Sequence, residues 1–167
     1  MKPPLQAFCV DYPGLARVLL SRVAIIPKYP FQPEIAQQIL ANPLDLTFTA
    51  VWDTGATHSV ITPNAINKLN LSGQIIRYTK VRGVNSESEQ PVYIVGGIVL
   101  PNNIIFYNWE LTESNIGDDA DLLIGMDIIS NGELTISRKE GKTKFCFSYP
   151  PHHKPFDLVE RNQRINK

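Results

Sequence analysis

The stretch Ala50-Val51-Trp52-Asp53-Thr54-Gly55-Ala56-Thr57 decides the fold of this chain. The large, β-branched and aromatic residues from Leu46 to Trp52 predict a strand, and Asp53 follows directly at its end. An unpaired carboxylate beside such a strand is costly to bury unless it is hydrogen-bonded or shares its charge. Gly55 is expected to free φ for a tight turn, and the small Ala56 lets another chain or a ligand approach. A carboxylate held rigidly by small neighbours is suited to act as a general base.

The Asp-Thr-Gly triplet, with apolar segments on both sides, resembles the active-site motif of aspartic proteases. A second stretch, Asp121-Leu122-Leu123-Ile124-Gly125-Met126-Asp127-Ile128-Ile129, resembles the other signature of that family, in which two large apolar residues and a glycine lead from a strand into a short helix. Gly125 follows Asp53 by 72 residues, and this spacing resembles the half-size, retroviral-type members, the retropepsins. Taken alone, Asp53 would instead be interpreted as an aspartate that caps an ordinary turn.

The resemblance covers about residues 44–150 and implies an all-β fold, a closed retropepsin-like barrel with one or two short helices, working as a dimer. We expect three parts: an amino-terminal extension (1–43), the aspartic protease domain (44–150) and a polar, mobile tail (151–167). The extension should hold a strand over 15–27. Its segment Glu34–Leu40 predicts either one or two helical turns or an extended arm across a partner. The expected strands are 44–52, 59–62, 75–84, 92–100, 104–111, 122–125, 133–139 and 143–149, with helices over 64–71 and 126–130.

Composition favours a globular protein, because 43% of the 167 residues are hydrophobic and 16 basic residues balance 16 acidic ones. This balance predicts no nucleic-acid or membrane partner. Cys9 and Cys146 could form a pair, but without a secretory signal they are more often free thiols, so a cytoplasmic location is the default. No metal or other cofactor is expected, because the acidic turn at 118–121 lacks the spacing of a calcium loop and His152-His153 lack partners.

Hydrolysis of a peptide bond by carboxylates requires two of them, and the chain holds a single Asp-Thr-Gly. The resemblance therefore implies a homodimer in which each chain supplies Asp53 as the catalytic residue at a two-fold axis. It further implies that Thr54, Gly55 and Ala56 support the active loop. Ile124 and Gly125 would pack behind that loop.

The hairpin around Arg82, Gly83, Val84, Asn85 and Ser86 stands where retropepsins carry the flap that closes over substrate. Its tip is polar, whereas retroviral flaps are glycine-rich. Thr57 and His58 occupy positions that contact substrate in the retroviral enzymes, and His58 is either a pH-sensitive contact or a partly exposed histidine beside a strand.

These features predict an aspartic endopeptidase that acts on peptides or proteins through an Asp53/Asp53′ dyad. A dimeric protein-binding or scaffolding module with the same fold and little or no proteolysis is the alternative. A third interpretation is a self-processing precursor that loses its amino-terminal segment. The polar flap favours a cellular, for instance bacterial, source over a viral one.

Overall fold

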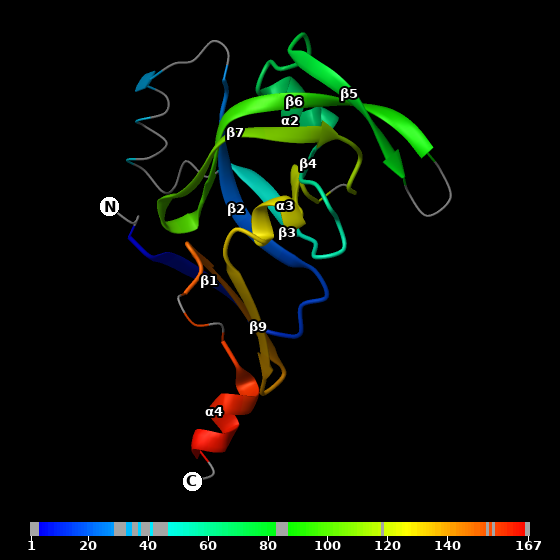
Figure 1. Cartoon of the computed structure of the whole chain (residues 1–167). Coiled ribbons are helices and arrows are strands. Elements are labelled where there is room, and N and C mark those ends of the chain that lie inside the picture. The colour runs from blue at the N-terminus through cyan, green and yellow to red at the C-terminus, as the bar shows by residue number, and fades with distance from the viewer. Residues whose placement is uncertain are drawn as a thin grey trace.

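A computed structural model describes residues 4–28, 33, 34, 37, 41, 47–82, 87–117, 119–152, 154 and 156–165. Its centre is a closed barrel of six strands, seen in the upper half of Figure 1. Around the barrel the order is β2 (Leu19–Ile26), β3 (Phe48–Trp52), β8 (Leu122–Ile124), β4 (Val60–Ile61), β7 (Ile104–Glu113) and β6 (Glu87–Leu100), which returns to β2. The parallel pairing β3–β8 and the antiparallel pairing β4–β8 bring the two motifs of the sequence side by side.

Alternating burial explains the barrel strands, as in β3, where Phe48, Ala50 and Trp52 point into the core and the residues between them do not. Strand β5 (Ile75–Arg82) adds to the outer edge of β6, and the β5–β6 hairpin projects away from the barrel (Figure 1). The expected hairpin is confirmed, with Arg82 paired to Glu87. The residues expected at its tip, 83–86, lie outside the described part of the chain.

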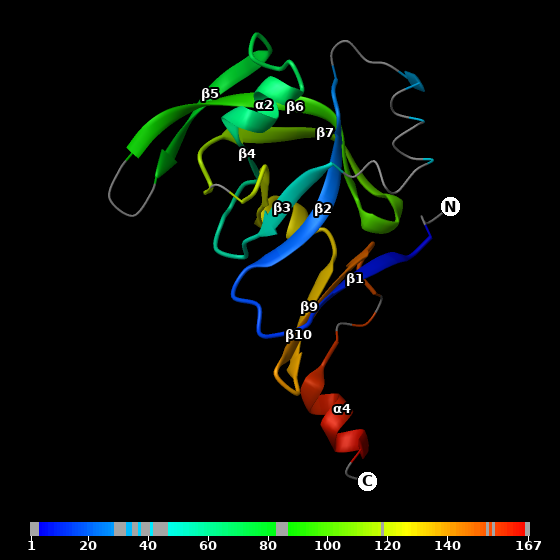
Figure 2. The same cartoon turned by 180° about the vertical axis from the view of Figure 1, so that it is seen from behind.

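A second, three-stranded sheet lies on the opposite side of the barrel from that hairpin, as both views show (Figures 1 and 2). Its order is β1 (Gln6–Tyr12), β10 (Lys142–Tyr149) and β9 (Glu133–Lys139), all antiparallel. Strands β9 and β10 are joined by Glu140 and Gly141, both at positive φ, as a two-residue hairpin turn requires. Phe8, Phe145 and Phe147 of this sheet are buried in the same core as the barrel strands.

The helices are short. Helix α2 (Pro63–Lys68) starts at Thr62, whose hydroxyl accepts a hydrogen bond from Ala65 N, and the proline at its first turn fits a helix start. A single 3₁₀ turn, η2 (Pro101–Asn103), joins β6 to β7, and α3 (Met126–Ile129) follows β8. Helix α4 (Leu158–Ile165) lies beyond the three-stranded sheet, at the end of the molecule away from the β5–β6 hairpin (Figures 1 and 2).

Several expectations need correction. Residues 158–165 form a helix, although the polar composition of the tail suggested a mobile end. Strand β2 closes the barrel between β3 and β6, so a boundary at residue 44 does not separate two structural units. Strand β1 was not expected at all, because its long-range partner β10 is what stabilises it. Most of Glu34–Leu40 lies outside the described residues.

Cys9 and Cys146 face each other across β1 and β10 and form a disulfide, so the expectation of free thiols is wrong. Across the residues that the structure describes, no helix has the length and apolar character needed to span a lipid bilayer.

Candidate active site

Asp53 stands at the carboxyl end of β3, where the chain leaves the barrel in an exposed loop that reaches β4 through Ser59. Its backbone N–H donates to the Ile124 carbonyl of β8 at 3.0 Å, so the ladder of the sheet continues up to the carboxylate-bearing residue. Its Oδ1 accepts a hydrogen bond from Gly55 N at 2.8 Å. Asp53, Thr54 and Gly55 are all exposed, so the carboxylate is fixed in direction and open to a ligand or a second chain.

Gly55 is required for space rather than for an unusual backbone angle. Its φ is not positive, contrary to the expectation from the sequence. A Cβ at this position would lie 3.2 Å from Asp53 Oδ1, closer than most side-chain contacts. A side chain at residue 55 would therefore push against the carboxylate.

The loop rests on the turn between β8 and α3. Met126 N donates to the Ala56 carbonyl at 2.8 Å, and Asp127 N donates to the Thr57 carbonyl at 3.2 Å. Gly125 is buried under the loop, where an added Cβ would lie 2.7 Å from the carbonyl carbon and oxygen of His58. The two motifs of the sequence thus form one rigid unit, in which Ile124 and Gly125 lie directly behind the loop.

Asp127 holds this unit together, and sequence reasoning gave it no role. Its Oδ1 accepts a hydrogen bond from the Ser59 hydroxyl at 2.7 Å. Its Oδ2 accepts hydrogen bonds from Ser59 N at 3.0 Å and from Trp109 Nε1 at 3.2 Å. Ser59 Oγ in turn accepts Gly125 N at 3.0 Å. The carboxylate joins the end of the active loop, strand β7 and helix α3. The signal available beforehand was an acidic residue in the first turn of a short helix, directly after the second motif.

Trp52, the residue before Asp53, anchors the other side of the loop. Its ring lies 5.0 Å from the Phe147 ring and 5.6 Å from the Phe145 ring, centroid to centroid, and its indole N–H donates to Ser21 Oγ at 3.0 Å. The three-stranded sheet is therefore packed directly against the strand that presents Asp53.

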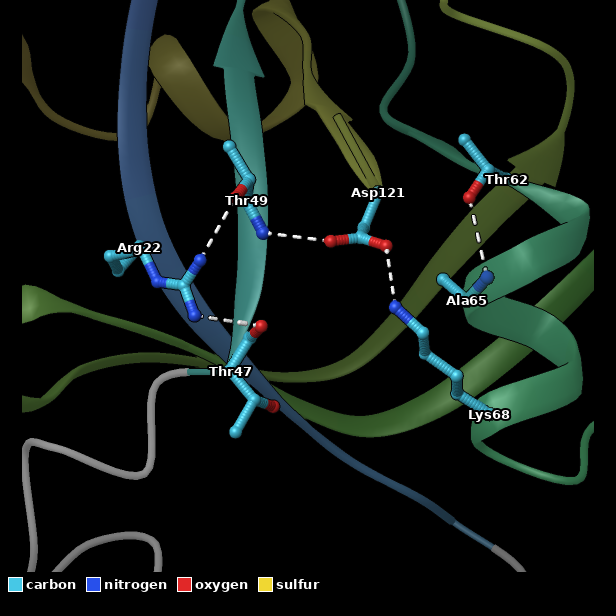
Figure 3. A network of polar contacts seen from close by, with 7 residues as sticks. All are labelled: Arg22, Thr47, Thr49, Thr62, Ala65, Lys68 and Asp121. Atoms are coloured by element: carbon cyan, nitrogen blue, oxygen red, sulfur yellow. Dashed lines mark hydrogen bonds and ion pairs between the residues drawn. The ribbon is translucent and has the colours of Figure 1, made fainter. Parts of the chain in front are cut away.

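A network of polar contacts fixes the other end of β3, away from the carboxylate (Figure 3). Asp121, at the start of β8, accepts Thr49 N at 3.0 Å and forms an ion pair with Lys68 of α2 at 3.3 Å. Arg22 of β2 donates to Thr49 Oγ1 and to the Thr47 carbonyl. Asp121 is thus part of the framework. No group of three or more His, Cys, Asp or Glu among the described residues is arranged to hold a metal ion.

A pocket of about 310 Å³ lies beside the active loop. His58 lies at its margin and is exposed, Arg77 and Glu110 form an ion pair within it at 2.5 Å, and Trp109 and Asp127 line it from β7 and α3. His58 and residues of the β5–β6 hairpin thus line the same pocket. Thr57 is exposed beside it, while the expected flap residues Gly83, Val84, Asn85 and Ser86 lie outside the described residues.

The family profile and a solved structure are consistent with the fold described above. The sequence profile of the aspartyl protease family matches residues 41–128, more than half of the chain. The crystal structure of a retropepsin-like aspartic protease from Rickettsia conorii aligns with 89% of this chain and 97% of its own, with a TM-score of 0.54 and 13% sequence identity. A retroviral protease-like domain of Ddi1 from Leishmania major aligns with 72% of this chain and 82% of its own, with a TM-score of 0.43 and 17% identity. No curated protein sequence matched. On its sequence motifs, its closed barrel and the profile match, the chain belongs to the retropepsin-like aspartic protease family.

Proposed function

We propose that two copies of this chain form an aspartic endopeptidase, with Asp53 of each copy facing the other across a two-fold axis. The observation that carries this proposal is the exposure of Asp53 at the start of the active loop, where its N–H is bonded to the Ile124 carbonyl and its Oδ1 to Gly55 N. One chain supplies one such carboxylate, and peptide hydrolysis of this kind needs two.

In the proposed reaction the dyad holds one proton between its two carboxyl groups. The ionised group takes a proton from a water molecule, which attacks the carbonyl carbon of the peptide, while the protonated group donates to the carbonyl oxygen. Proton return to the amide nitrogen then accompanies cleavage of the C–N bond, so no covalent intermediate, metal or cofactor is needed. Thr54 is proposed to hydrogen-bond across the axis, and the β5–β6 hairpin to close over the substrate.

Ala56 bears on the pH range of this activity. It cannot donate the hydroxyl hydrogen bond that a serine gives the carboxylate at this position in pepsin-like enzymes. The ionised carboxylate then accepts one hydrogen bond fewer and is less favoured. The working pH range should therefore reach closer to neutral than that of pepsin. An optimum well below pH 3 would contradict this part of the proposal.

The test is cleavage of a diverse peptide library between about pH 3 and 7 by the wild type and by Asp53→Asn, since dyads of this type work within that range. Sedimentation at several protein concentrations shows where each variant is dimeric. Asp53→Asn keeps the shape of the loop and removes the base, so cleavage should be lost while the dimer remains. A wild-type dimer that cleaves nothing would favour the protein-binding module, or a precursor that awaits removal of its amino-terminal segment.

The Cys9–Cys146 bond bears on where the enzyme works. Disulfides persist in oxidising compartments and are rare where thiols are kept reduced. We therefore favour an oxidising environment over the cytoplasmic location expected from the sequence, and labelling of free thiols in protein isolated without reductant would decide between them.

A further inference from the structure

We propose that the pocket beside the active loop is a specificity subsite that takes an uncharged carboxamide side chain, glutamine or asparagine, from the substrate. This inference rests on the proposed function, because it concerns the peptide that the Asp53 dyad would cleave. The group that selects the side chain is the ion pair between Arg77 and Glu110.

The pocket lies between two elements that a peptide bound at Asp53 would contact. His58, at its margin, follows Asp53 by five residues on the active loop. Arg77 and Thr79 reach it from β5, the outer strand of the hairpin that is proposed to close over the substrate. The loop and the hairpin lie on the same side of the barrel in both views (Figures 1 and 2). A volume of about 310 Å³ is at the lower end of the range for ligand pockets, about 300 to 1,000 Å³, and suits a single side chain.

Two irregular positions in the strands aim side chains at this pocket. The pairing of β5 with β6 shifts register just before Arg77. Asn108, directly before Trp109 in β7, has a φ of 51°, in the left-handed region that asparagine tolerates better than most residues. Such irregularities redirect the side chains beside them. Trp109 is held by its hydrogen bond to Asp127 and by the Phe106 ring, 5.4 Å away centroid to centroid, so this wall of the pocket is rigid.

Asp127 lines the pocket but is not available to a ligand. Its Oδ1 accepts hydrogen bonds from the Ser59 hydroxyl and from Ile128 N. Its Oδ2 accepts hydrogen bonds from Ser59 N and from Trp109 Nε1. Four hydrogen bonds occupy the lone-pair sites of a carboxylate, so this residue cannot bind a substrate side chain as well.

The ion pair is the remaining charged feature of the pocket wall. Arg77 Nε and Nη2 both donate to Glu110 Oε2, at 3.2 and 2.5 Å. Among the described residues, neither Arg77 Nη1 nor Glu110 Oε1 makes a further hydrogen bond. The pair therefore presents a free donor group and a free acceptor, and its two charges cancel. His58 is exposed at the margin, where water weakens its electrostatic interaction with a ligand.

A carboxamide matches this arrangement. Its NH₂ group can donate to Glu110 Oε1 and its oxygen can accept from the guanidinium of Arg77, without bringing a charge into the pocket. A carboxylate would meet Glu110 as a like charge, and an ammonium group would meet Arg77 in the same way. An aliphatic side chain would displace water from both groups and replace none of the hydrogen bonds.

The test is a set of peptides in which each position in turn is glutamine, asparagine, glutamate, lysine or leucine. Cleavage by the wild type is measured at one pH between about 5 and 7, where a free glutamate side chain is ionised. One position should favour an amide over the other three residues by about tenfold in kcat/KM, as hydrogen bonds to charged groups allow. Calorimetry of the same peptides with Asp53→Asn measures the preference in binding, without cleavage.

Charge reversal separates recognition from structure. Arg77→Glu places two carboxylates in the pocket and should move the preference at that position to lysine. Glu110→Arg should move it to glutamate. The double variant Arg77→Glu/Glu110→Arg rebuilds the ion pair in the opposite order and should restore the amide preference, which a loss of folding cannot do. Lys80→Glu, at an exposed residue of β5 that does not line the pocket, is the matched control and should leave the preference unchanged.

An amide preference that follows the charges of these variants supports the subsite, whether it is measured in cleavage or only in binding to Asp53→Asn. Binding with this preference, but no cleavage by the wild-type dimer, overturns the protease and leaves the subsite standing. Cleavage in which no position favours an amide, or in which the two charge reversals leave the preference unmoved, overturns the subsite and leaves the protease standing. Peptides that are neither cleaved nor bound overturn both.

Discussion

Asp127 shows how much of the site depends on a carboxylate that is proposed to do no chemistry. It accepts hydrogen bonds from the backbone and hydroxyl of Ser59 and from the Trp109 indole, and it is half-buried. Ser59 is the last residue of the active loop, and Asp127 holds it in place. The position of Asp53, at the start of the same loop, therefore depends on Asp127.

Asp127→Ala should therefore lower both stability and activity. Hydrogen bonds to a charged group contribute about 1.5 to 3 kcal/mol each, and the donors left behind lose their acceptor, so we expect a loss of roughly 2 to 4 kcal/mol in urea unfolding. Asp119→Ala, at an exposed residue of the turn before β8, is the matched control and should change little. Equal stability of the two variants would refute the role given to Asp127.

Gly125 is a second residue at which one added atom would displace the active loop. Gly125→Ala would place a methyl group 2.7 Å from the His58 carbonyl, so the loop must move. We expect destabilisation of about 1 to 3 kcal/mol and, if the chain is a protease, a fall in kcat/KM. Gly73→Ala is the control, because nothing lies within 4 Å of its added methyl. Thermal unfolding of both variants measures the difference.

Among the elements, those predicted from the sequence are the ones specified locally. The β5–β6 and β9–β10 hairpins follow from alternating apolar residues with polar turns between them, and α2 from Thr62 and Pro63. The Asp53 loop and Gly125 were also identified, because each motif lies in one short stretch.

What the sequence could not indicate depends on partners far along the chain. Strand β1 exists through its pairing with β10, and β2 belongs to the barrel through its pairing with β6. Asp127 meets Ser59 across 68 residues, and no local pattern encodes that contact. Helix α4 is short and exposed, so its composition resembles that of a tail.

The three-stranded sheet should owe much of its stability to the Cys9–Cys146 bond, which closes a separation of 137 residues. Cross-linking so long a loop restricts the unfolded chain and stabilises the fold by about 2 to 5 kcal/mol. Cys9→Ser/Cys146→Ser should unfold at correspondingly lower urea concentration, and reductant should affect the wild type but not the double variant. A wild type indifferent to reductant would contradict this expectation.

At the scale of the whole molecule, two ionisable groups tie stability to pH. Burial, reinforced by its hydrogen bond to Glu113, raises the pKa of Tyr93 from 10.0 to about 12. The hydrogen bond from His152 lowers the pKa of Glu133 below its usual 4.5. The fold thus favours neutral Tyr93 and ionised Glu133.

The tyrosine gives the clearer prediction. Its contribution to the free energy of unfolding is complete below pH 10 and is lost as pH rises toward about 12. Over that interval the unfolded chain releases a proton that the folded chain retains. The melting temperature should fall over that interval, and Tyr93→Phe, which has no proton to lose, should show a smaller fall. Parallel curves for the two proteins would refute the assignment. Glu133 acts at acid pH: its contribution to the stability of the fold is lost as the pH falls below the usual pKa of a glutamate.

The two tryptophans sit in environments so different that the chain carries its own optical reporters. Trp52 is buried against phenylalanine rings of the core. Trp109 is half-buried, lines the pocket beside the active loop and donates a hydrogen bond to Asp127. A peptide that enters this pocket should shift the emission of Trp109 and leave that of Trp52 constant. Fluorescence of Trp52→Phe would then follow occupancy directly, in Asp53→Asn as well as in the wild type, and so separate binding from cleavage without any added dye.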